Sequence, residues 1–381
     1  MSGLVRAAGG SGRRDVRRVR RAFLQRVLVR AALGLALALA GAAAVQAQEP
    51  GLAVFSLPDK NWGVGLSLQN FIINESRTYP DGKARLVRAD RQAEGMILTV
   101  FIAPAAGEDS ARACRDAFWQ RLQNGPAASG YRDVRQSESG DMGSSELASS
   151  EYVIGEIQGI RIDQKHVHAY LGREGSCIEI HLSKTLFEPK DQELFAAVLR
   201  TVRLVEANAA PVVQTIRTYR VSSRDAVELT MPPAWQDEFP GGRENAGPTL
   251  SLLPATTKDV LSLLTVLVPP TEGRDGSYNA PDKLRKRTEA AGQRLLEKST
   301  EDKLRIEEVK GPEVTGYMFT ITDKNPGSGP WDFRHVTHAE AGLRDVTLSF
   351  SLFFQAPGVP DRAAALEVFK NARLIAVPPS R

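Results

Sequence analysis

Three of the five histidines in the chain, and one of its two cysteines, fall in one short stretch, "KHVHAYLGREGSCIEIHLSK", residues 165–184. Imidazole nitrogens and carboxylate oxygens are ligands for zinc and copper ions, and a thiol beside an imidazole can act as a nucleophile. These residue types therefore suggest two kinds of chemistry, metal binding and thiol catalysis. Which of them the chain can perform depends on the elements that hold the side chains.

The stretch has the pattern of two antiparallel strands joined by a turn at "GREGS". Apolar residues alternate along each strand: Val167, Ala169 and Leu171 on the first, and Ile178, Ile180 and Leu182 on the second. If both apolar sets share one face of the sheet, the pairs on the other face are His166 with His181, His168 with Glu179, and Tyr170 with Cys177. Opposed Cβ atoms lie about 4.5–5.5 Å apart, close enough for side chains to share an ion. The candidate metal ligands are His166, His168, Glu179 and His181.

The alternative interpretation is a polar sheet face, open to solvent or covered by a helix, on which His and Glu form hydrogen bonds. A later stretch with the same pattern, residues 334–354, has His335 in the place of His166. Its second strand offers Thr347, Ser349 and Ser351, and hydroxyls are poor ligands for zinc and copper. Short metal signatures such as HExxH are missing from the sequence. These observations favour a polar face without a cofactor, with the metal site as the alternative.

The two cysteines leave three possibilities. Cys114 belongs to a predicted helix, "DSARACRDAFWQRLQ" (109–123), where helical spacing puts it on the apolar face and Asp109 is the expected cap. Cys177 belongs to a strand of the hairpin. Two cysteines in an exported chain suggest one disulfide. Two separate buried thiols, or a catalytic pair of Cys177 with His181 or His168, are the alternatives.

The chain contains one pattern twice. Residues 165–204 match residues 334–374 in order, 84–105 match 248–270, and Trp62 matches Trp235, at an offset that stays near 170 residues. A matched order of features at a steady offset indicates a duplicated unit. The Pro-containing stretch "VEANAAPVVQ" (205–214) has the composition of a linker. We therefore expect one domain over residues 48–205, a linker over 206–214 and a second domain over 215–381.

Each copy has the pattern of an α+β domain. Alternating β-branched and aromatic residues predict strands at "MILTVFIAP" (96–104) and "DVTLSFSLFF" (345–354). Helices are expected at 109–123 and 279–298, and each copy closes with a helix, at 191–202 and 361–372. The Ser- and Gly-rich stretch 137–152 is interpreted as a polar loop.

A Leu-Pro or Met-Pro followed by tryptophan, two early strands ending at "APA" or "VPP", a helix, more strands and a closing helix resemble the PsbP/DcrB-like fold, once per copy. The resemblance implies an antiparallel sheet flanked by helices, an α/β/α sandwich. It also implies an extracytoplasmic protein that binds or assists rather than catalyses. The resemblance supplies no catalytic residues to transfer to this chain.

The first 47 residues have the order of a secretory signal. Nine arginines and one aspartate precede an uncharged apolar stretch at 31–45, and "VQA" ends at Ala47, the expected cleavage point. The apolar stretch is shorter than the roughly 20 residues that span a bilayer. "RRAFL" (20–24) resembles a twin-arginine signature, and the general secretory route is the alternative. We expect a signal peptide over residues 1–47 and a periplasmic or secreted mature protein without a membrane span; an uncleaved anchor is the alternative.

The net charge of +4 belongs to the signal peptide, because removing its nine arginines and one aspartate leaves 40 basic and 44 acidic residues. The mature chain therefore has no excess of basic residues for binding nucleic acid. Phosphate-loop and GxSxG motifs are also missing. The sequence favours a non-catalytic envelope protein that binds a partner protein or a small ligand. The alternative is a metal-binding protein or metalloenzyme that uses His166, His168, Glu179 and His181.

Overall fold

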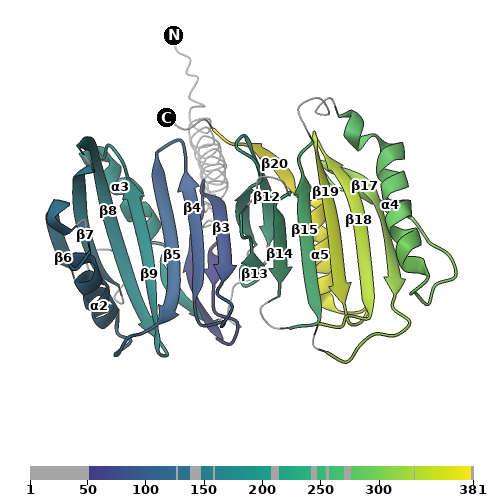
Figure 1. Ribbon diagram of the computed structural model, residues 1–381, viewed down its shortest axis with the longest axis horizontal. Coiled ribbons are helices and arrows are strands. Elements are labelled where there is room, and N and C mark those ends of the chain that lie inside the picture. The colour runs from purple at the N-terminus through teal and green to yellow at the C-terminus, as the bar shows by residue number, and fades with distance from the viewer. Residues whose placement is uncertain are drawn as a thin grey trace, which may run out of the picture. The chain divides into compact units, whose positions relative to one another are not determined.

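The computed structural model describes residues 51–125, 128–137, 147–157, 159–206, 214–241, 247–254, 257–269, 276–329 and 331–378. The predicted signal peptide over residues 1–47 lies outside these residues, and so does most of the predicted linker over 206–214. The described chain is mixed α+β and consists mostly of antiparallel sheet with few helices (Figure 1). The α+β class predicted from the sequence is confirmed.

The first half of the described chain, residues 51–206, contains β1 (Ala53–Phe55), β2 (Trp62–Leu66), β3 (Ile72–Thr78), β4 (Arg85–Arg91), β5 (Met96–Pro104), α2 (Ala111–Gln123), β6 (Tyr131–Ser137), β7 (Ala148–Ile157), β8 (Ile160–Arg173), β9 (Ser176–Lys184), α3 (Gln192–Leu199) and β10 (Arg203–Glu206). The second half, residues 214–378, contains β11 (Thr215–Arg220), β12 (Asp225–Met231), β13 (Gln236–Glu238), β14 (Thr249–Leu253), β15 (Val260–Leu267), α4 (Pro281–Leu296), β16 (Glu307–Lys310), β17 (Val314–Thr322), β18 (His335–Leu343), β19 (Val346–Phe354), α5 (Pro360–Lys370) and β20 (Arg373–Ala376). Short 3₁₀ turns lie at Ala128–Gly130, Pro189–Asp191 and Ser277–Asn279.

The two halves have the same strand order. In the first half, β1-β2-β10 form a small sheet, and β3-β4-β5-β9-β8-β7-β6 are consecutive strands of a larger one. In the second half, β11-β12-β20 and β13-β14-β15-β19-β18-β17-β16 follow the same two orders. The neighbouring strands within these groups pair antiparallel. A strand pattern that occurs twice in sequence therefore occurs twice in space.

The apolar core lies on one face of each larger sheet. Alternation along β5 and β9 turns Leu98, Val100, Ile178 and Ile180 to the same side, and all four are at most 1% exposed. Helix α3 packs on that side with Phe195, and the corresponding helix of the second half, α5, stacks Phe369 on a β19 phenylalanine. Burying such a side chain stabilises the fold by roughly 1.5–3 kcal/mol.

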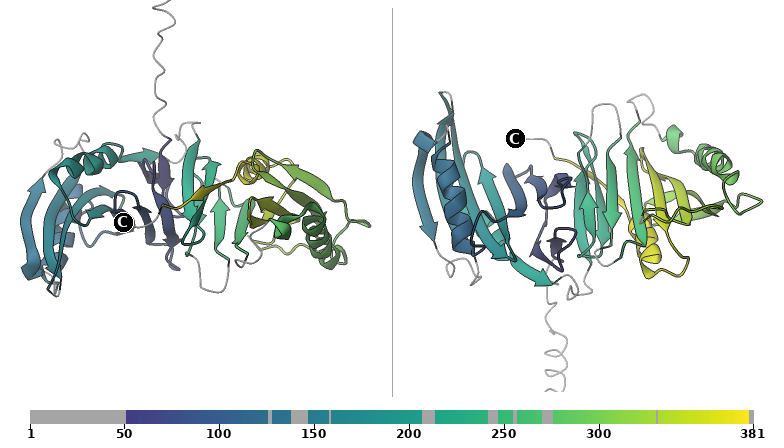
Figure 2. Two further views of the ribbon diagram at one scale, coloured as in Figure 1. Left: turned by 90° about the horizontal axis from the view of Figure 1, so that it is seen from above. Right: turned by 60° about the horizontal axis from the view of Figure 1, so that its bottom comes forward.

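Helix α2 packs against the opposite face of the first sheet, along β7 and β8, and α4 packs against β17 and β18 (Figure 2). The N-cap of α2 is Ser110, whose hydroxyl accepts a hydrogen bond from the Ala113 amide at 3.2 Å. The prediction that Asp109 is the cap was wrong. Its carboxylate instead accepts a hydrogen bond from the Gly175 amide in the β8–β9 turn at 2.6 Å.

The two halves are joined by more than the covalent chain. Strand β11 pairs in parallel with β3 over two residues, so strands of the second half extend the sheet of the first. Beside this contact, Asp237 Oδ1 accepts hydrogen bonds from Arg85 Nη2 at 2.8 Å and Arg217 Nη1 at 2.9 Å. The Tyr219 hydroxyl donates to Oδ2 at 2.8 Å. These side chains are at most 2% exposed, so two arginines from different halves share one buried carboxylate, and Arg85 also lies 3.5 Å from Glu238.

Candidate functional site on the histidine face

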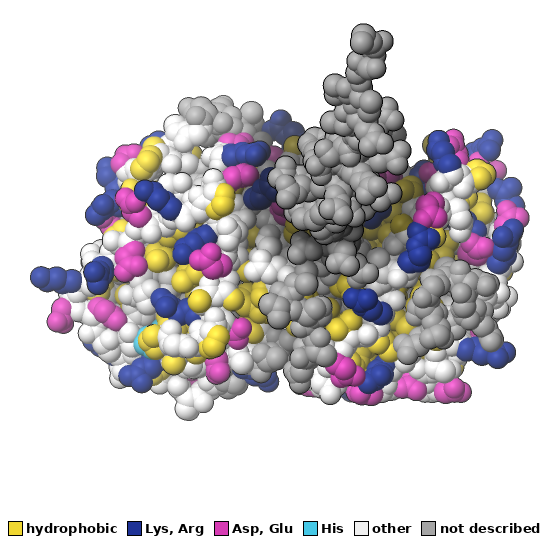
Figure 3. Space-filling model, turned by 180° about the vertical axis from the view of Figure 1, so that it is seen from behind, with side chains coloured by type: hydrophobic (Ala, Val, Ile, Leu, Met, Phe, Trp, Pro, Cys, Tyr) yellow, Lys and Arg dark blue, Asp and Glu magenta, His cyan; other side chains and the backbone are white. Residues whose placement is uncertain are grey.

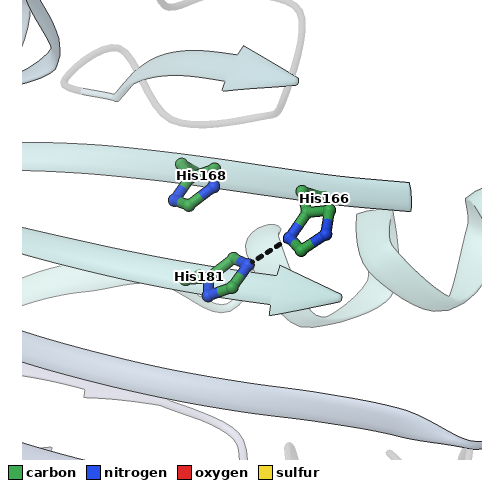
Figure 4. Close-up of side chains that lie close together, drawn as sticks. All are labelled: His166, His168 and His181. Atoms are coloured by element: carbon green, nitrogen blue, oxygen red, sulfur yellow. Dashed lines mark hydrogen bonds between the residues drawn. The ribbon is translucent and has the colours of Figure 1, made fainter. Parts of the chain in front are cut away.

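Strands β7, β8 and β9 turn a set of polar side chains toward α2. We call this surface the histidine face, and its members are Tyr152, His166, His168, Glu179 and His181. His166 and His168 come from β8 and His181 comes from β9 (Figure 4). Side chains two residues apart on a strand point to the same face of the sheet, so His166 and His168 lie on one side. The predicted convergence of the three imidazoles is therefore present in the structure.

The predicted register of the hairpin was wrong by two residues. The observed pairs are His168 with His181, Tyr170 with Glu179, and Gly172 with Cys177, whereas His166 lies opposite Ser183. The turn contains only Glu174 and Gly175, with φ of 48° and 74°, which is the backbone of a tight two-residue hairpin. The stretch "GREGS" (172–176), expected to form the turn, has five residues. A slip of two residues leaves every side chain on its predicted face.

The polar atoms of the histidine face form two hydrogen-bonded groups. His168 Nδ1 lies 2.8 Å from Glu179 Oε1, and because a carboxylate can only accept, the ring donates. His168 Nε2, 3.2 Å from the Tyr152 hydroxyl, is then the acceptor. In the second group, His166 Nδ1 and His181 Nε2 are 3.0 Å apart (Figure 4). His168 is thus held between a donor and an acceptor.

Burial keeps the His166 and His181 rings and the Tyr152 phenol uncharged. It lowers the pKa of His166 from 6.5 to about 4, with a smaller contribution from the nearby His168. Burial also holds the pKa of His181 well below its ordinary value, and the two neighbouring imidazoles act in the same direction. The pKa of Tyr152 is raised by burial, and further by Tyr131 and Glu179. At neutral pH the His166 and His181 rings therefore each have one lone pair, one of which accepts the hydrogen bond between them, and the Tyr152 phenol keeps its proton.

Aromatic side chains of α2 cover the face. The Phe118 ring centroid lies 5.2 Å from that of His168, and Trp119 lies 5.9 Å from Tyr152. Of the three possibilities for the cysteines, the structure contains the disulfide: Cys114 on α2 is bonded to Cys177 on β9, with Cα atoms 5.6 Å apart. The covered face is thus the one that carries the histidines, and α2 is covalently attached to it.

The three imidazoles could hold a metal ion after a change of ring orientation. One nitrogen of each ring lies within 4.8 Å of the others, whereas tetrahedral zinc with bonds of 2.0–2.1 Å places its nitrogens about 3.3 Å apart. The His168 and His181 rings are stacked, with centroids 4.1 Å apart and planes 1° from parallel. Lone pairs in parallel planes cannot meet at one point, so one of these rings must rotate for both to bind.

In the second half, the positions that correspond to His166, His168 and His181 carry a different set of side chains. The β18–β19 turn consists of Arg344 and Asp345, which lie 170 residues after the two residues of the β8–β9 turn. At this offset His168 corresponds to His338. The predicted match of His166 with His335 was therefore wrong by one residue, and Val336 corresponds to His166. Ser351 corresponds to His181, and its hydroxyl lies 3.0 Å from His338 Nδ1.

Sequence reasoning missed Tyr152. The stretch 137–152 was interpreted as a loop because it is rich in serine and glycine, but β7 begins at Ala148. The run from Tyr152 to Ile154 was the available signal, since Tyr, Val and Ile are frequent in strands. The Tyr152 ring stacks on His166 with centroids 4.8 Å apart and so belongs to the site.

A cavity of about 650 Å³ lies on the opposite side of the same sheet, between α3 and the strands β6 and β7. Val167, Phe195 and Leu199 form its apolar floor, and Arg135 and Arg200 lie at its rim. Volumes of about 300–1,000 Å³ are typical of small-molecule sites. This groove is separate from the histidine face because alternate residues of β8 face opposite sides of the sheet.

Charged side chains of both signs are interspersed on the surface seen in Figure 3. Within the part of the chain that the structure describes, none of the helices has the length and apolar character needed to cross a membrane. No family model and no curated protein matches this chain.

Proposed function

We propose that this chain is an exported, non-catalytic binding protein whose histidine face holds one zinc or copper ion. One observation carries the proposal: imidazoles of His166, His168 and His181 gather within 4.8 Å under a covering helix. In addition, His166 Nε2 is buried and has no hydrogen-bond partner among the described residues. An unpaired buried polar atom costs about 1–3 kcal/mol, and an ion bound by this ring would offset part of that cost.

The ligand types favour a transition metal over calcium or magnesium. Neutral imidazoles suit zinc and copper, whereas calcium and magnesium prefer oxygen ligands. Glu179 fits the role of a supporting group rather than a ligand, because it accepts from His168 Nδ1 and leaves Nε2 to face an ion. Metal-bound histidines usually make such a bond to a carboxylate. The ion would displace the Tyr152 hydroxyl from Nε2.

The arrangement favours binding over catalysis. Catalytic zinc sites keep a position open for water or substrate. Here Phe118 and Tyr152 pack on the imidazoles, and both cysteines are joined in the disulfide. A closed site of this kind suits an ion that is stored or that stabilises the fold.

Two further parts of the proposal rest on the sequence. The signal-like first 47 residues support export to the periplasm or the medium. The repeated strand order supports a tandem pair of related domains, for which we retain the PsbP/DcrB-like resemblance. Fusion of two such units through a shared sheet and buried ion pairs gives a rigid body, which suits a protein that presents a binding site.

Elemental analysis of untagged protein, purified from the export compartment, tests the metal proposal. We expect about one equivalent of zinc or copper in the native protein, and its loss in His166→Ala and in His181→Ala. The matched control is His338→Ala, which alters the second half at the position corresponding to His168 and should keep the ion. Protein without metal that fails to take up added zinc, both with the Cys114–Cys177 disulfide intact and after its reduction, would contradict the proposal, as would equal metal content in all variants.

The groove beside α3 supports a second candidate function, binding of a small amphiphile with an acidic head group. Its floor is apolar, and an anion could bind the arginines at its rim in exchange for their present carboxylate partners, Glu151 and Glu193. Leu366 on α5 corresponds to Ala196 on α3 and packs against the core. Ala196→Leu should fill the groove and abolish binding of anilinonaphthalene sulfonate to the native protein. Ala197→Leu, on the exposed side of α3, is the control, and equal dye binding by both variants would exclude the groove.

A further inference from the structure

Two attachments hold the start of α2 over the histidine face. The Cys114–Cys177 disulfide joins the first turns of the helix to β9, two residues from Glu179. The Asp109 carboxylate binds the amide of the β8–β9 turn, and the main chain of Asp109 packs against Gly172, where a Cβ atom would lie 1.4 Å from its carbonyl oxygen. The helix and the hairpin are thus joined at one end.

The second half shows which attachment the fold can do without. Asn279 corresponds to Asp109 and donates hydrogen bonds to the carbonyls of Arg344 and Val346 at 3.0 and 2.7 Å. Leu284 and Thr347 correspond to the two cysteines, and α4 still packs on β17 and β18. The helix-to-hairpin contact is therefore general to both halves, whereas the disulfide is specific to the half with three converging histidines.

An ion at the histidine face is covered by the same helix. Phe118 lies over His168 and Tyr170, with ring centroids 5.2 and 5.6 Å apart, and His168 is only 2% exposed. Phe118 covers His168 while His181 is partly exposed, so α2 must move away from the sheet for an ion to reach or leave His168 together with the other two imidazoles. A covalent bond between that helix and β9 opposes such a movement.

We propose that the Cys114–Cys177 disulfide is a redox-sensitive latch that controls metal exchange at the histidine face; this inference rests on the proposed metal site. A reductant of the dithiol class would break the sulfur–sulfur bond. Two electrons and two protons pass to the cysteines, which become two thiols, and the reductant becomes a disulfide. Cys177 is partly exposed, so a reductant has access to one of the two sulfurs.

Zinc release from the loaded protein into an excess of a chromophoric chelator tests the latch. The variant Cys114→Leu/Cys177→Thr places the residues of the second half at the disulfide positions, and we expect it to release zinc at least about ten-fold faster than the oxidised protein. Wild-type protein reduced with a phosphine should match the variant. Leu284→Ala, which weakens the packing of α4 in the second half, controls for general destabilisation and should leave the release rate unchanged.

The outcomes separate the two proposals. Equal release rates from the oxidised protein and the double variant, each loaded with one zinc ion, would overturn the latch and leave the metal site intact. Failure of the oxidised protein to bind zinc after prolonged loading, together with failure of the double variant, would refute the metal site and the latch with it. Zinc uptake by the double variant alone would support both, because the closed latch would then block entry.

Discussion

Acid should weaken the fold through His166. Its folded-state pKa of about 4 lies below the ordinary value of 6.5, because burial disfavours the charged ring. The unfolded chain therefore binds a proton at higher pH than the folded chain does. The stabilising contribution of neutral His166 is fully present above pH 6.5 and is lost as the pH falls toward about 4.

The size of the effect follows from the same two values. The gap between 6.5 and about 4 corresponds to roughly 3 kcal/mol, since each pKa unit equals 1.36 kcal/mol. About 2 kcal/mol of this should already be lost at pH 5, where the unfolded ring is charged and the folded ring is still mostly neutral. The side chain is 8% exposed, so screening by solvent reduces the effect little.

Urea unfolding of the metal-free protein, followed by tryptophan fluorescence at pH 7.5 and pH 5, measures this loss. Carboxylates also begin to titrate in this range, so the informative quantity is the difference between wild type and His166→Gln, which cannot be protonated. We expect the wild type to lose about 2 kcal/mol more than the variant. An equal loss in both proteins would show that His166 is not buried as a neutral ring.

Three further predictions concern the framework around the site, each measured as a free energy of unfolding. Asp237→Ala should cost about 3–5 kcal/mol, because it leaves buried Arg217 without its carboxylate partner and Arg85 with only Glu238, 3.5 Å away; a cost under 1 kcal/mol would contradict the described junction. Gly172→Ala should cost about 2 kcal/mol or more, because the new methyl group overlaps a carbonyl before α2, whereas Gly358→Ala, with open space around it, should be nearly neutral. Replacing Cys114 and Cys177 by Leu and Thr should cost up to about 4 kcal/mol, given a sequence separation of 63 residues.

Local patterns predicted several strands and the faces of the β8–β9 hairpin correctly, but not β7, which begins inside the stretch interpreted as a loop. The run at 96–104 is β5, and alternation placed the three histidines of β8 and β9 on one side of the sheet. Hairpin register was not predictable from alternation alone, because a slip of two residues preserves the faces and only the turn distinguishes the alternatives. The turn at Glu174 and Gly175 is shorter than the five polar residues that mark it in the sequence.

Long-range contacts were outside the reach of the sequence patterns. Arg85 and Asp237 are separated by 152 residues, and nothing local indicates that they meet. Tyr152 was not predicted to lie on a strand, because it ends a Ser- and Gly-rich segment whose composition is typical of loops. The covering of the histidine face by α2 depends on which side of a sheet a helix crosses, and the pattern of the helix does not determine that side. The polar face was predicted, whereas the choice between exposure to solvent and cover by a helix was left open.

A crystal structure of zinc-soaked protein with an anomalous difference map at the zinc edge tests the central claim most directly. The account predicts one peak in the first half, about 2.0–2.1 Å from one nitrogen each of His166, His168 and His181, with the stack of His168 on His181 broken. Density that leaves the imidazoles stacked and hydrogen bonded, with no zinc peak beside them, would contradict it.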